Sequence, residues 1–502
     1  MKLEVEDITI DKNKNIKLYS ENNNYKLYQG SMLDMLEVIE QNSIDSIITD
    51  PPYELNFMNK GWDNSGIAFQ SDTWKKCYEV LKPGGYLLAF GGSRTFHRIA
   101  CAIEDAGFEI RDTIMWLYGS GFPKSMDISK QIDKRPNRSY ENLNLFGKKL
   151  KEQREQKGYS KNDIDKIMGT NTAYAWWEGR NYLGEFKIQL PDKENYEKLK
   201  EILELNDDMD FIFEEAEREI IGQKEKLESY QYKNNNVYQT NGDKEKVIID
   251  ITIPSTDLAK QWQGWGTALK PSFEPIIVAR KPFKGSLVDN VIEYGVGGIN
   301  IDECRVETND KLKEQKNGKN SLFGGLRNIE NMSGNYIPNN NGRFPANTIL
   351  TYDEIPSDER LRYFYCAKAS KKDRDEGLED FEYKKFYSTL NTKNGSGERL
   401  DGGNTPIRKN THPTVKPTSL MQYLVRLVNS DEAIILDPFN GSGSTGKAVM
   451  YENKERNKNY KYIGIELTEE YLPIAKARIE YVCNLKEEKN NQPTIFDYIE
   501  KK

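Results

Sequence analysis

Apolar and polar positions follow two distinct periods over the first quarter of the chain. Runs of consecutive apolar residues are typical of buried strands, and apolar residues spaced three or four apart are typical of helices that cover a sheet. The pattern predicts strands at 43–50, 86–92 and 109–119, and helices at 73–85 and 98–108. We expect Pro83-Gly84-Gly85 to end the first helix and Gly107 to end the second. Strands that alternate with helices predict βαβ units and a mainly parallel sheet.

The same alternation returns near the C-terminus. It predicts, in order, a helix at 420–429, a strand at 433–439, a glycine-rich turn leading into a helix at 441–452, a strand at 462–467 and a helix at 469–482. The sequence between the two regions, roughly 136 to 345, is rich in Asn, Lys and Glu. We therefore expect an α/β fold made of two βαβ halves, with an inserted, mainly helical region.

Composition narrows the classes of protein that the chain can be. Its 502 residues give room for several domains, and 37% hydrophobic residues are enough for a real core. The chain has no run of about 18 apolar residues and no signal-like N-terminus, so we expect a soluble, cytoplasmic protein that does not associate with a membrane. The 5 Cys are scattered and there are only 2 His. Neither a disulfide framework nor a metal site is therefore predicted.

The net charge of −7 hides an uneven distribution of charge along the chain. Residues 124–180 hold 13 Lys and Arg against 8 Asp and Glu, whereas residues 201–220 hold 1 against 9. A basic segment of this kind is compatible with a nucleic-acid partner even in an acidic chain.

The turn at 440–447, Asn-Gly-Ser-Gly-Ser-Thr-Gly-Lys, lies between a predicted strand and a predicted helix, where backbone N–H groups face a ligand. Three ligands compete for it. As G-x-x-x-x-G-K it resembles a nucleotide-phosphate loop, but Ala448 follows, where a Ser or Thr would hold magnesium. As G-x-G-x-x-G it resembles a dinucleotide turn, and Glu466, 20 residues after Gly446, stands where a ribose-binding acid is expected. The third ligand is S-adenosylmethionine, whose carboxylate and ribose hydroxyls would use the same groups.

A second segment, Asp50-Pro51-Pro52-Tyr53, separates these alternatives. It follows the strand predicted at 43–50, at the carboxyl edge where ligands bind in such sheets. An adenine amine is a poor nucleophile because its lone pair is delocalised into the ring, and the Asp50 carboxylate and the Pro51 carbonyl would engage its two hydrogens. Consecutive prolines hold that carbonyl rigidly, and Tyr53 would stack on a base taken out of the duplex. The segment favours methylation of an exocyclic amine; a proline-rich turn with a buried Tyr is the structural alternative.

The chain resembles the amino-directed DNA methyltransferases of the beta arrangement, in which D-P-P-Y comes first and D-P-F-x-G-S-G last. Asp50 precedes Asp437, and THPTVKP at 411–417 resembles the family segment just before the cofactor turn. Blocks that resemble phage- and prophage-borne members lie at 59–66, 110–125, 264–282, 290–306, 342–350 and 365–374. One departure is Ser31, where members often carry an Asp that is thought to contact the cofactor.

This resemblance implies a Rossmann-like methyltransferase sheet with S-adenosyl-L-methionine as the cofactor. The implied cofactor-binding residues are Lys416, Pro417, Asp437, Phe439, Gly441, Gly443 and Glu466, and the implied catalytic residues are Asp50, Pro51, Pro52 and Tyr53. The implied activity is site-specific methylation of the N6 amine of adenine in double-stranded DNA, by base flipping and direct displacement, as in restriction–modification. N4-cytosine methylation is one alternative, and a DNA-binding regulator with an inert methyltransferase body is another. The recognised sequence and the existence of a homodimer stay open.

The inserted region has a resemblance of its own. Residues 146–186 resemble the helix-turn-helix of phage repressor-type regulators, and residues 190–205 resemble its closing helix. The resemblance assigns four residues to DNA contact: Asn171, Thr172 and Tyr174 to bases, and Arg180 to a phosphate. A helical bundle that packs only on its own chain is the alternative. The acidic residues 207–220 predict a solvated helix, followed by a flexible connector.

Together these features predict five segments. They are the first half of the methyltransferase domain with the catalytic motif (1–139), the helix-turn-helix-like module with its acidic connector (140–232), a return segment with target-recognition loops (233–345), the second half with the cofactor site (346–485) and a polar tail (486–502).

Overall fold

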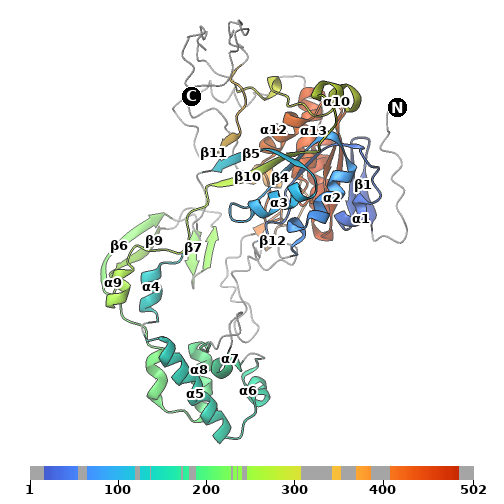
Figure 1. The fold of residues 1–502 in the computed structure, drawn as a ribbon. Coiled ribbons are helices and arrows are strands. Elements are labelled where there is room, and N and C mark those ends of the chain that lie inside the picture. Colours follow the sequence, from blue (N-terminus) through green and yellow to red (C-terminus); the bar gives the residue numbers. More distant parts are fainter. Residues whose placement is uncertain are drawn as a thin grey trace, which may run out of the picture. The chain divides into compact units, whose positions relative to one another are not determined.

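The computed structural model describes residues 16–54, 65–118, 125–135, 137–170, 173–179, 188–227, 230–233, 236–239, 246–306, 342–351, 369–385 and 407–485. The chain divides into two compact units (Figure 1). The larger unit combines residues 1–121 with 272–384 and 408–502, and the smaller unit consists of residues 122–271 with 385–407. The two regions of alternating strands and helices therefore belong to one unit.

A nine-stranded sheet forms the centre of the larger unit, in the order β1-β2-β15-β14-β3-β4-β10-β5-β11. Its strands are β1 (Lys17–Glu21), β2 (Tyr25–Gln29), β3 (Ile44–Thr49), β4 (Leu81–Phe90), β5 (Glu109–Tyr118), β10 (Phe273–Arg280), β11 (Thr348–Thr351), β14 (Ile434–Asp437) and β15 (Lys461–Glu466). Strands β2, β15, β14, β3 and β4 run parallel, and β10 is antiparallel to both β4 and β5. Because β14 lies directly beside β3, the strand ends that precede the predicted catalytic and cofactor residues meet at one edge.

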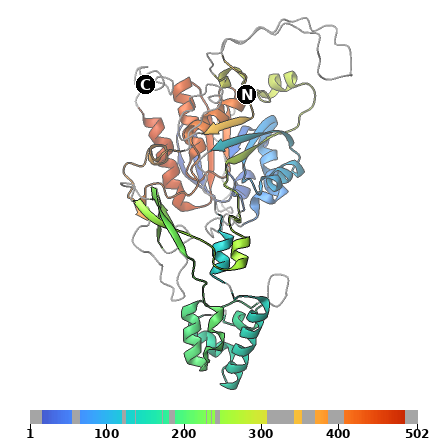
Figure 2. The ribbon, with the colours of Figure 1, turned by 90° about the vertical axis from the view of Figure 1, so that its left-hand side faces the viewer.

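Helices cover both faces of this sheet (Figure 2). One face carries α1 (Met32–Leu36), α2 (Ser71–Val80) and α3 (Phe96–Asp105), and the other carries α12 (Thr418–Val428), α13 (Ser444–Arg456) and α14 (Leu472–Asn484). Shorter elements of the larger unit are η3 (Ile67–Phe69), η5 (Asp302–Cys304), α11 (Lys371–Asp375) and η7 (Glu469–Tyr471), and β12 (Lys384–Lys385) and β13 (Ile407–Arg408) border the smaller unit. The predicted α/β fold with a mainly parallel sheet is confirmed, and the structure adds that helices cover both of its faces.

The first predicted helix ends before the glycine pair. Helix α2 stops at Val80 and β4 begins at the next residue, so Pro83, Gly84 and Gly85 lie inside a strand. The Gly84 N–H donates to the Lys281 carbonyl (2.9 Å) and the Lys281 N–H donates to the Gly85 carbonyl (3.0 Å). These hydrogen bonds to Lys281, which directly follows β10, keep the segment inside the sheet, and Gly84 has a left-handed φ of 82°, so the glycine pair forms an irregularity within β4 and does not end the helix.

Helices of the smaller unit form a helical module with its own core. Its elements are α5 (Tyr140–Gln156), α6 (Lys161–Met168), α7 (Ala175–Glu178), α8 (Lys193–Leu203) and the 3-10 helix η4 (Asp207–Ile212). Phe146, Leu150, Trp177 and Leu199 are buried in one apolar cluster, to which no strand of the nine-stranded sheet contributes a residue that the structure describes. The predicted helical character of the insertion is confirmed.

The acidic residues 207–220 do not form the predicted solvated helix. Met209, Ile212 and Phe213 are buried in the core of the helical module, so apolar packing overrides the charge pattern. The chain continues with β6 (Ile220–Leu227) and β7 (Tyr230–Lys233), and β8 (Asn236–Gln239) lies within residues 233–246, where the connector was expected. Strand β6 pairs with β9 (Lys246–Thr252), and β7 pairs with β8.

Asp133 joins the two ends of the smaller unit. It ends α4 (Ile128–Asp133), and its buried carboxylate accepts hydrogen bonds from Arg218 Nη1 (2.5 Å), the Ser255 N–H (3.0 Å) and the Thr256 hydroxyl (2.8 Å). Thr256 in turn caps α9 (Asp257–Gln261). The smaller unit extends beyond residues 140–232 at both ends because these flanking segments bind each other.

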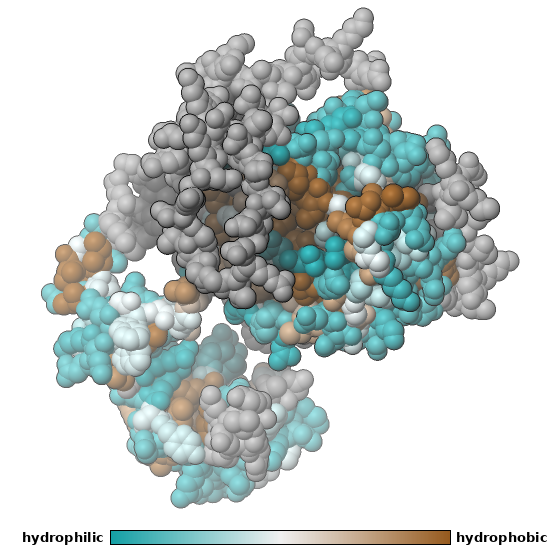
Figure 3. Space-filling view, turned by 45° about the horizontal axis from the view of Figure 1, so that its top comes forward, coloured by the Kyte–Doolittle hydropathy of each residue, from teal (hydrophilic) through white to brown (hydrophobic). Residues whose placement is uncertain are grey.

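Among the residues that the structure describes, no helix has the length and apolar character needed to cross a membrane. Hydrophobic residues do reach the surface, as the brown areas in Figure 3 show. On α10 (Leu287–Tyr294) of the larger unit, the side chains of Val288 and Ile292 are 66% and 79% exposed.

Candidate active site

The carboxyl end of β3 carries the segment Asp50-Pro51-Pro52-Tyr53, in which both prolines are buried. Asp50 Oδ2 accepts a hydrogen bond from Lys416 Nζ at 2.6 Å. The other oxygen, Oδ1, is buried and accepts no hydrogen bond from the described residues. A buried acceptor without a donor costs free energy. This oxygen is therefore available to the N–H group of a ligand.

Glu274 and Thr95 hold Tyr53 in place. Tyr53 donates its hydroxyl to Glu274 Oε2 (3.0 Å), on β10, and the Thr95 hydroxyl donates to the Tyr53 carbonyl (2.8 Å). Lys416 Nζ lies 3.4 Å from the same Glu274 oxygen. Its ammonium also lies 5.4 Å from the centroid of the Tyr53 ring and 4.9 Å from that of Phe90. The segment is thus fixed from three sides.

Burial and charge act against each other in this cluster. Burial raises the pKa of Asp50, and the Lys416 ammonium opposes that shift. Burial alone would lower the pKa of Lys416, but the charges of Asp50 and Glu274 outweigh it and the pKa is raised. Burial, and then the charges of Asp50 and Glu274, raise the pKa of Tyr53 well above its usual range. Lys416 is therefore a cation and Tyr53 a neutral phenol.

The glycine-rich turn follows β14 and opens α13. Gly441 and Gly443 have left-handed φ angles of 52° and 72°. A Cβ atom added to Gly441 would lie 2.8 Å from His412 Nε2, and one added to Gly443 would lie 3.0 Å from Ala475. Only glycine satisfies both the conformation and the close packing at these two positions.

Glu466, at the end of β15, closes the turn from behind. Its Oε2 accepts the Gly441 N–H (2.7 Å) and its Oε1 accepts the Thr468 N–H (2.7 Å). Burial raises the pKa of Glu466 to about 7. Each carboxylate oxygen has two lone pairs, so each keeps one acceptor position. This geometry fits a ligand that presents two neighbouring hydroxyls, such as a ribose.

Asp437 links the turn to the catalytic strand. Its Oδ1 accepts the Thr49 hydroxyl (2.7 Å) and the Phe439 N–H (3.1 Å), and its Oδ2 accepts the Thr445 hydroxyl (2.6 Å). Burial raises the pKa of Asp437 to about 6. Phe439 is partly buried, with its ring centroid 6.4 Å from that of Trp74. The contacts of Asp437 fix the position of the turn, and its predicted contact with the cofactor stays a prediction.

The side chain of Lys447 argues against a nucleotide-phosphate loop. Its buried ammonium donates to Asp373 Oδ1 (2.9 Å) and lies 2.8 Å from Glu376 Oε2. In a phosphate loop the lysine must reach the phosphate oxygens. An ammonium that is already paired with two carboxylates behind the turn does not serve that purpose.

The segment before α12 contacts both parts of the site. Lys416 binds the catalytic segment, although the resemblance assigned it to the cofactor, and Pro417 is the N-cap of α12. The His412 ring packs against Gly441, and Arg374 donates to the His412 carbonyl at 3.2 Å. Burial lowers the pKa of His412 to about 3, so the ring is neutral.

Sequence reasoning missed four residues of this region: Thr95, Glu274, Asp373 and Arg478. The last two lie behind the glycine turn, where Arg478 Nη1 donates to the Ser442 carbonyl at 2.8 Å. Two of the four lie in blocks, 264–282 and 365–374, that carried the family resemblance, which was the available signal. Ser31 stands where family members often carry a cofactor-contacting Asp, and here its hydroxyl caps α1.

Three of the residues assigned to DNA contact, Asn171, Thr172 and Arg180, lie outside the described residues. The fourth, Tyr174, precedes α7 and its side chain is 48% exposed. An aromatic ring at this position is free to meet a partner, whereas Trp177, one turn further on, is buried in the module.

The basic side chains of α5 are largely engaged within the module. Lys149 lies 3.1 Å from Asp208, and Lys151 lies 3.2 Å from Glu178. Arg154 is 6% exposed and belongs to the core. Helix α5 therefore offers a phosphate backbone fewer available cations than its composition suggests.

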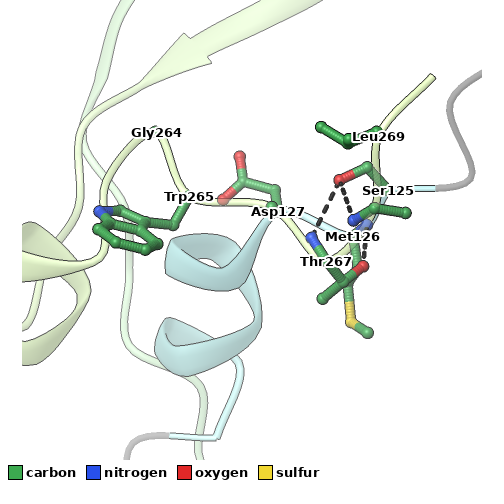
Figure 4. Close-up of a pocket in the computed structure, with 9 residues that line it drawn as sticks. Ser125, Met126, Asp127, Gly264, Trp265, Thr267 and Leu269 are labelled. Atoms are coloured by element: carbon green, nitrogen blue, oxygen red, sulfur yellow. Dashed lines mark hydrogen bonds between the residues drawn. The ribbon is translucent and has the colours of Figure 1, made fainter.

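An open cavity of 690 Å³ lies within the smaller unit (Figure 4). Residues 125–127 and 264–269 line it. Ser125 Oγ accepts the N–H groups of Thr267 (3.1 Å) and Ala268 (3.3 Å), which joins the two segments. Its lining residues all differ from the predicted catalytic and cofactor residues.

A mainly parallel sheet, with a glycine turn and a buried acid on adjacent strands, defines an enzyme class that binds a nucleoside cofactor. The family model for N6 and N4 DNA methylases matches residues 44–477, which is most of the chain. The chain belongs to this DNA methylase family. Membership of a DNA methylase family indicates S-adenosyl-L-methionine as the cofactor. Of the three ligands considered for the glycine turn, family membership therefore favours S-adenosyl-L-methionine over a nucleotide phosphate and a dinucleotide.

Individual relatives align over shorter stretches. The type II methyltransferase M.HpaI of Haemophilus parainfluenzae is 33% identical over 114 residues, 22% of this chain and 36% of that protein. The DNA adenine methyltransferase YhdJ of Escherichia coli (strain K12) is 33% identical over 69 residues, 14% of this chain and 21% of that protein. The chain thus spans well under half the length of these relatives. Among solved structures, the PvuII DNA methyltransferase (cytosine-N4-specific) aligns with 93% of this chain and 88% of that one, with 11% identity and a TM-score of 0.35.

Proposed function

We propose that the protein is a site-specific DNA methyltransferase that methylates the N6 amine of adenine in double-stranded DNA. The observation that carries the proposal is the buried, unpaired Asp50 Oδ1 at the carboxyl end of β3. The hydrogen bond between Thr49 and Asp437 ties this strand to the turn assigned to the cofactor. An acceptor for an amine therefore follows the strand that is hydrogen-bonded to the turn proposed to hold the methyl donor.

In the proposed reaction, Asp50 Oδ1 and the Pro51 carbonyl accept the two hydrogens of the target amine. The bond to these acceptors localises the lone pair on the nitrogen. S-adenosyl-L-methionine, when bound, supplies an electrophilic methyl group on its sulfonium. The nitrogen–carbon bond forms as the sulfur–carbon bond breaks, and Asp50 takes the proton that the amine loses. Tyr53 stacks on the flipped base.

We assign the cofactor site to the turn and its surroundings. Glu466 accepts the two ribose hydroxyls, and the left-handed glycines Gly441 and Gly443 let the ligand approach the backbone closely. The resemblance also assigns Phe439, which directly precedes the turn in the sequence, and Pro417, the N-cap of α12, to this site. Asp437 and Lys416, which the resemblance assigns to the cofactor, stay in the proposed site, and their contacts with Thr49, Thr445 and Asp50 also hold the catalytic strand in position.

We prefer adenine over cytosine as the target base because family members with the D-P-P-Y motif usually methylate adenine. The relative YhdJ is by name an adenine methyltransferase. The test is to incubate the protein with labelled S-adenosyl-L-methionine and unmethylated duplex DNA, and to identify the labelled nucleoside. Labelled N6-methyladenine supports the proposal. Labelled N4-methylcytosine alone would overturn the choice of base, and no label in DNA, with cofactor binding intact, would favour an inert regulator.

We further propose that the helical module contacts the DNA as a phage repressor-type helix-turn-helix, as its sequence resembles. The exposed Tyr174 supports this proposal, with Asn171, Thr172 and Arg180 beside it in the sequence. An enzyme of this kind acts in the cytoplasm as part of a restriction–modification system or alone. A homodimer would place two such modules on one duplex, and size-exclusion chromatography with and without DNA tests for it.

A further inference from the structure

One residue behind the glycine turn, Asp373, contacts three helices of the larger unit through its carboxylate and its backbone carbonyl. Asp373, on α11, accepts the Thr418 N–H (3.0 Å) and hydroxyl (2.5 Å) at the start of α12. Its Oδ1 also accepts Lys447 Nζ of α13 at 2.9 Å. Its carbonyl accepts Lys447 Nζ (3.0 Å) and Arg478 Nη2 of α14 (3.3 Å). The side chains of Lys447 and Arg478 are fully buried.

The two cations that Asp373 binds, Lys447 and Arg478, connect it to the cofactor turn. Arg478 Nη1 donates to the Ser442 carbonyl (2.8 Å), the Ser442 hydroxyl (3.1 Å) and the Ser444 hydroxyl (3.2 Å). Lys447 is the last residue of the glycine-rich segment and belongs to the first turn of α13. The shape of the turn therefore depends on two buried cations whose charge Asp373 helps to balance.

The contact of Asp373 with Thr418 connects it to the catalytic segment. Thr418 is two residues from Lys416, whose ammonium binds Asp50 at 2.6 Å. The intervening Pro417 restricts the backbone between them. A shift of Thr418 is therefore transmitted to the ammonium that holds the catalytic carboxylate.

We propose that Asp373 is a positioning residue that couples the S-adenosyl-L-methionine turn to the catalytic segment at Asp50. The proposal deepens the proposed methyltransferase function and rests on it for its catalytic readout. The carboxylate and carbonyl of Asp373 contact Thr418, Lys447 and Arg478. Its loss should therefore act through Arg478 and Lys447 on cofactor affinity, and through Thr418 and Lys416 on turnover.

Two variants separate the effect of Asp373 on cofactor affinity from its effect on turnover. Asp373→Asn keeps the shape of the side chain but removes the charge that faces Lys447 and Arg478. We expect the Kd for S-adenosyl-L-methionine to rise and kcat to fall, each by about tenfold or more. The loss of one hydrogen bond to a charged group changes an equilibrium constant by about that factor. Thr418→Val removes only the hydroxyl contact. We expect it to lower kcat several-fold with the cofactor Kd unchanged.

Glu452 provides a matched control. It is also a buried acid, with 0% of its side chain exposed, and it binds Arg426 (2.6 Å) across α12 and α13. Glu452→Gln therefore disturbs a buried ion pair between the same two helices without touching the turn. We expect it to lower thermal stability but to leave cofactor Kd and kcat within about twofold at a temperature where it is folded.

Cofactor binding is measured by calorimetry and turnover by labelled methyl transfer to duplex DNA. Equal effects of Asp373→Asn and Glu452→Gln on Kd and kcat would overturn the proposal, because Asp373 would then act only through stability. If Asp373→Asn does not fold, Thr418→Val decides: unchanged kcat, or a raised Kd, would overturn the coupling. A wild type that binds S-adenosyl-L-methionine without methylating DNA would refute the proposed function. The change in the calorimetric Kd for S-adenosyl-L-methionine in Asp373→Asn would then still test the effect of Asp373 on cofactor binding.

Discussion

Glu466 should make cofactor binding depend on pH. Its carboxylate is buried behind Gly441, and burial raises its pKa to about 7. We propose that only the ionised form accepts both ribose hydroxyls, because a protonated carboxyl presents one donor in place of an acceptor. The sign follows directly: affinity for S-adenosyl-L-methionine is full above pH 7 and falls as the pH drops through that value.

The magnitude can be worked from the pKa. For a group that must be ionised, the apparent Kd rises by a factor of 1 + 10^(pKa − pH), which is about 11 at pH 6 and about 1.1 at pH 8. The expected loss between pH 8 and pH 6 is therefore about tenfold, or about 1.4 kcal/mol. Calorimetric titration at half-unit steps of pH measures it.

Glu466→Gln is the matched variant, because it keeps the shape of the side chain and cannot titrate. The α-amino group of the cofactor titrates near pH 8, so the readout is the difference between the two proteins and not the wild-type curve alone. We expect the variant to bind about tenfold or more weakly at pH 8 and to lose the additional weakening toward pH 6. Parallel curves for both proteins would refute this role of Glu466.

Two other outcomes are expected in the smaller unit. Tyr174→Ala should weaken binding to a preferred duplex by about 1–3 kcal/mol and leave a random duplex and the cofactor unaffected, as fluorescence anisotropy can measure; equal loss on both duplexes contradicts a base contact. Asp133→Ala should strip α4 and α9 of about 3 kcal/mol of protection against hydrogen exchange, because it leaves Arg218 unpaired. Asp257→Ala, which removes an exposed ion pair with Lys260, should change that protection little, and the idea fails if the two variants behave alike.

The sequence was informative where one strand end or one turn carries the chemistry. Asp50 and Gly441 could be located because an apolar run predicts the strand before each of them, and parallel strands present their carboxyl ends at one edge. Glu466 follows from the spacing after the turn. These are local signals, so they survive the long insertion between the two halves of the sheet.

Contacts between distant residues could not be read in this way. The motif around Lys416 predicts a cofactor contact, which stays a prediction, but it gave no sign that the Lys416 ammonium binds Asp50, which lies 366 residues earlier. Asp373 and Arg478 have no motif of their own, and only packing brings them together behind the turn. Residues 207–220 misled the prediction because their charge pattern outweighed three apolar side chains, which the core of the helical module buries.

The most direct test of the account replaces Asp50, the residue proposed to act on the target amine and not on the cofactor. In Asp50→Ala, Lys416 keeps Glu274 as a partner at 3.4 Å, so the site is not left with an unpaired cation. Labelled methyl transfer and calorimetry are measured on the same preparation. We expect methyl transfer to fall by at least about 10²–10³-fold, with the Kd for S-adenosyl-L-methionine within about twofold of the wild type. Methylation that persists, or a cofactor affinity lost in proportion to turnover, would contradict the account.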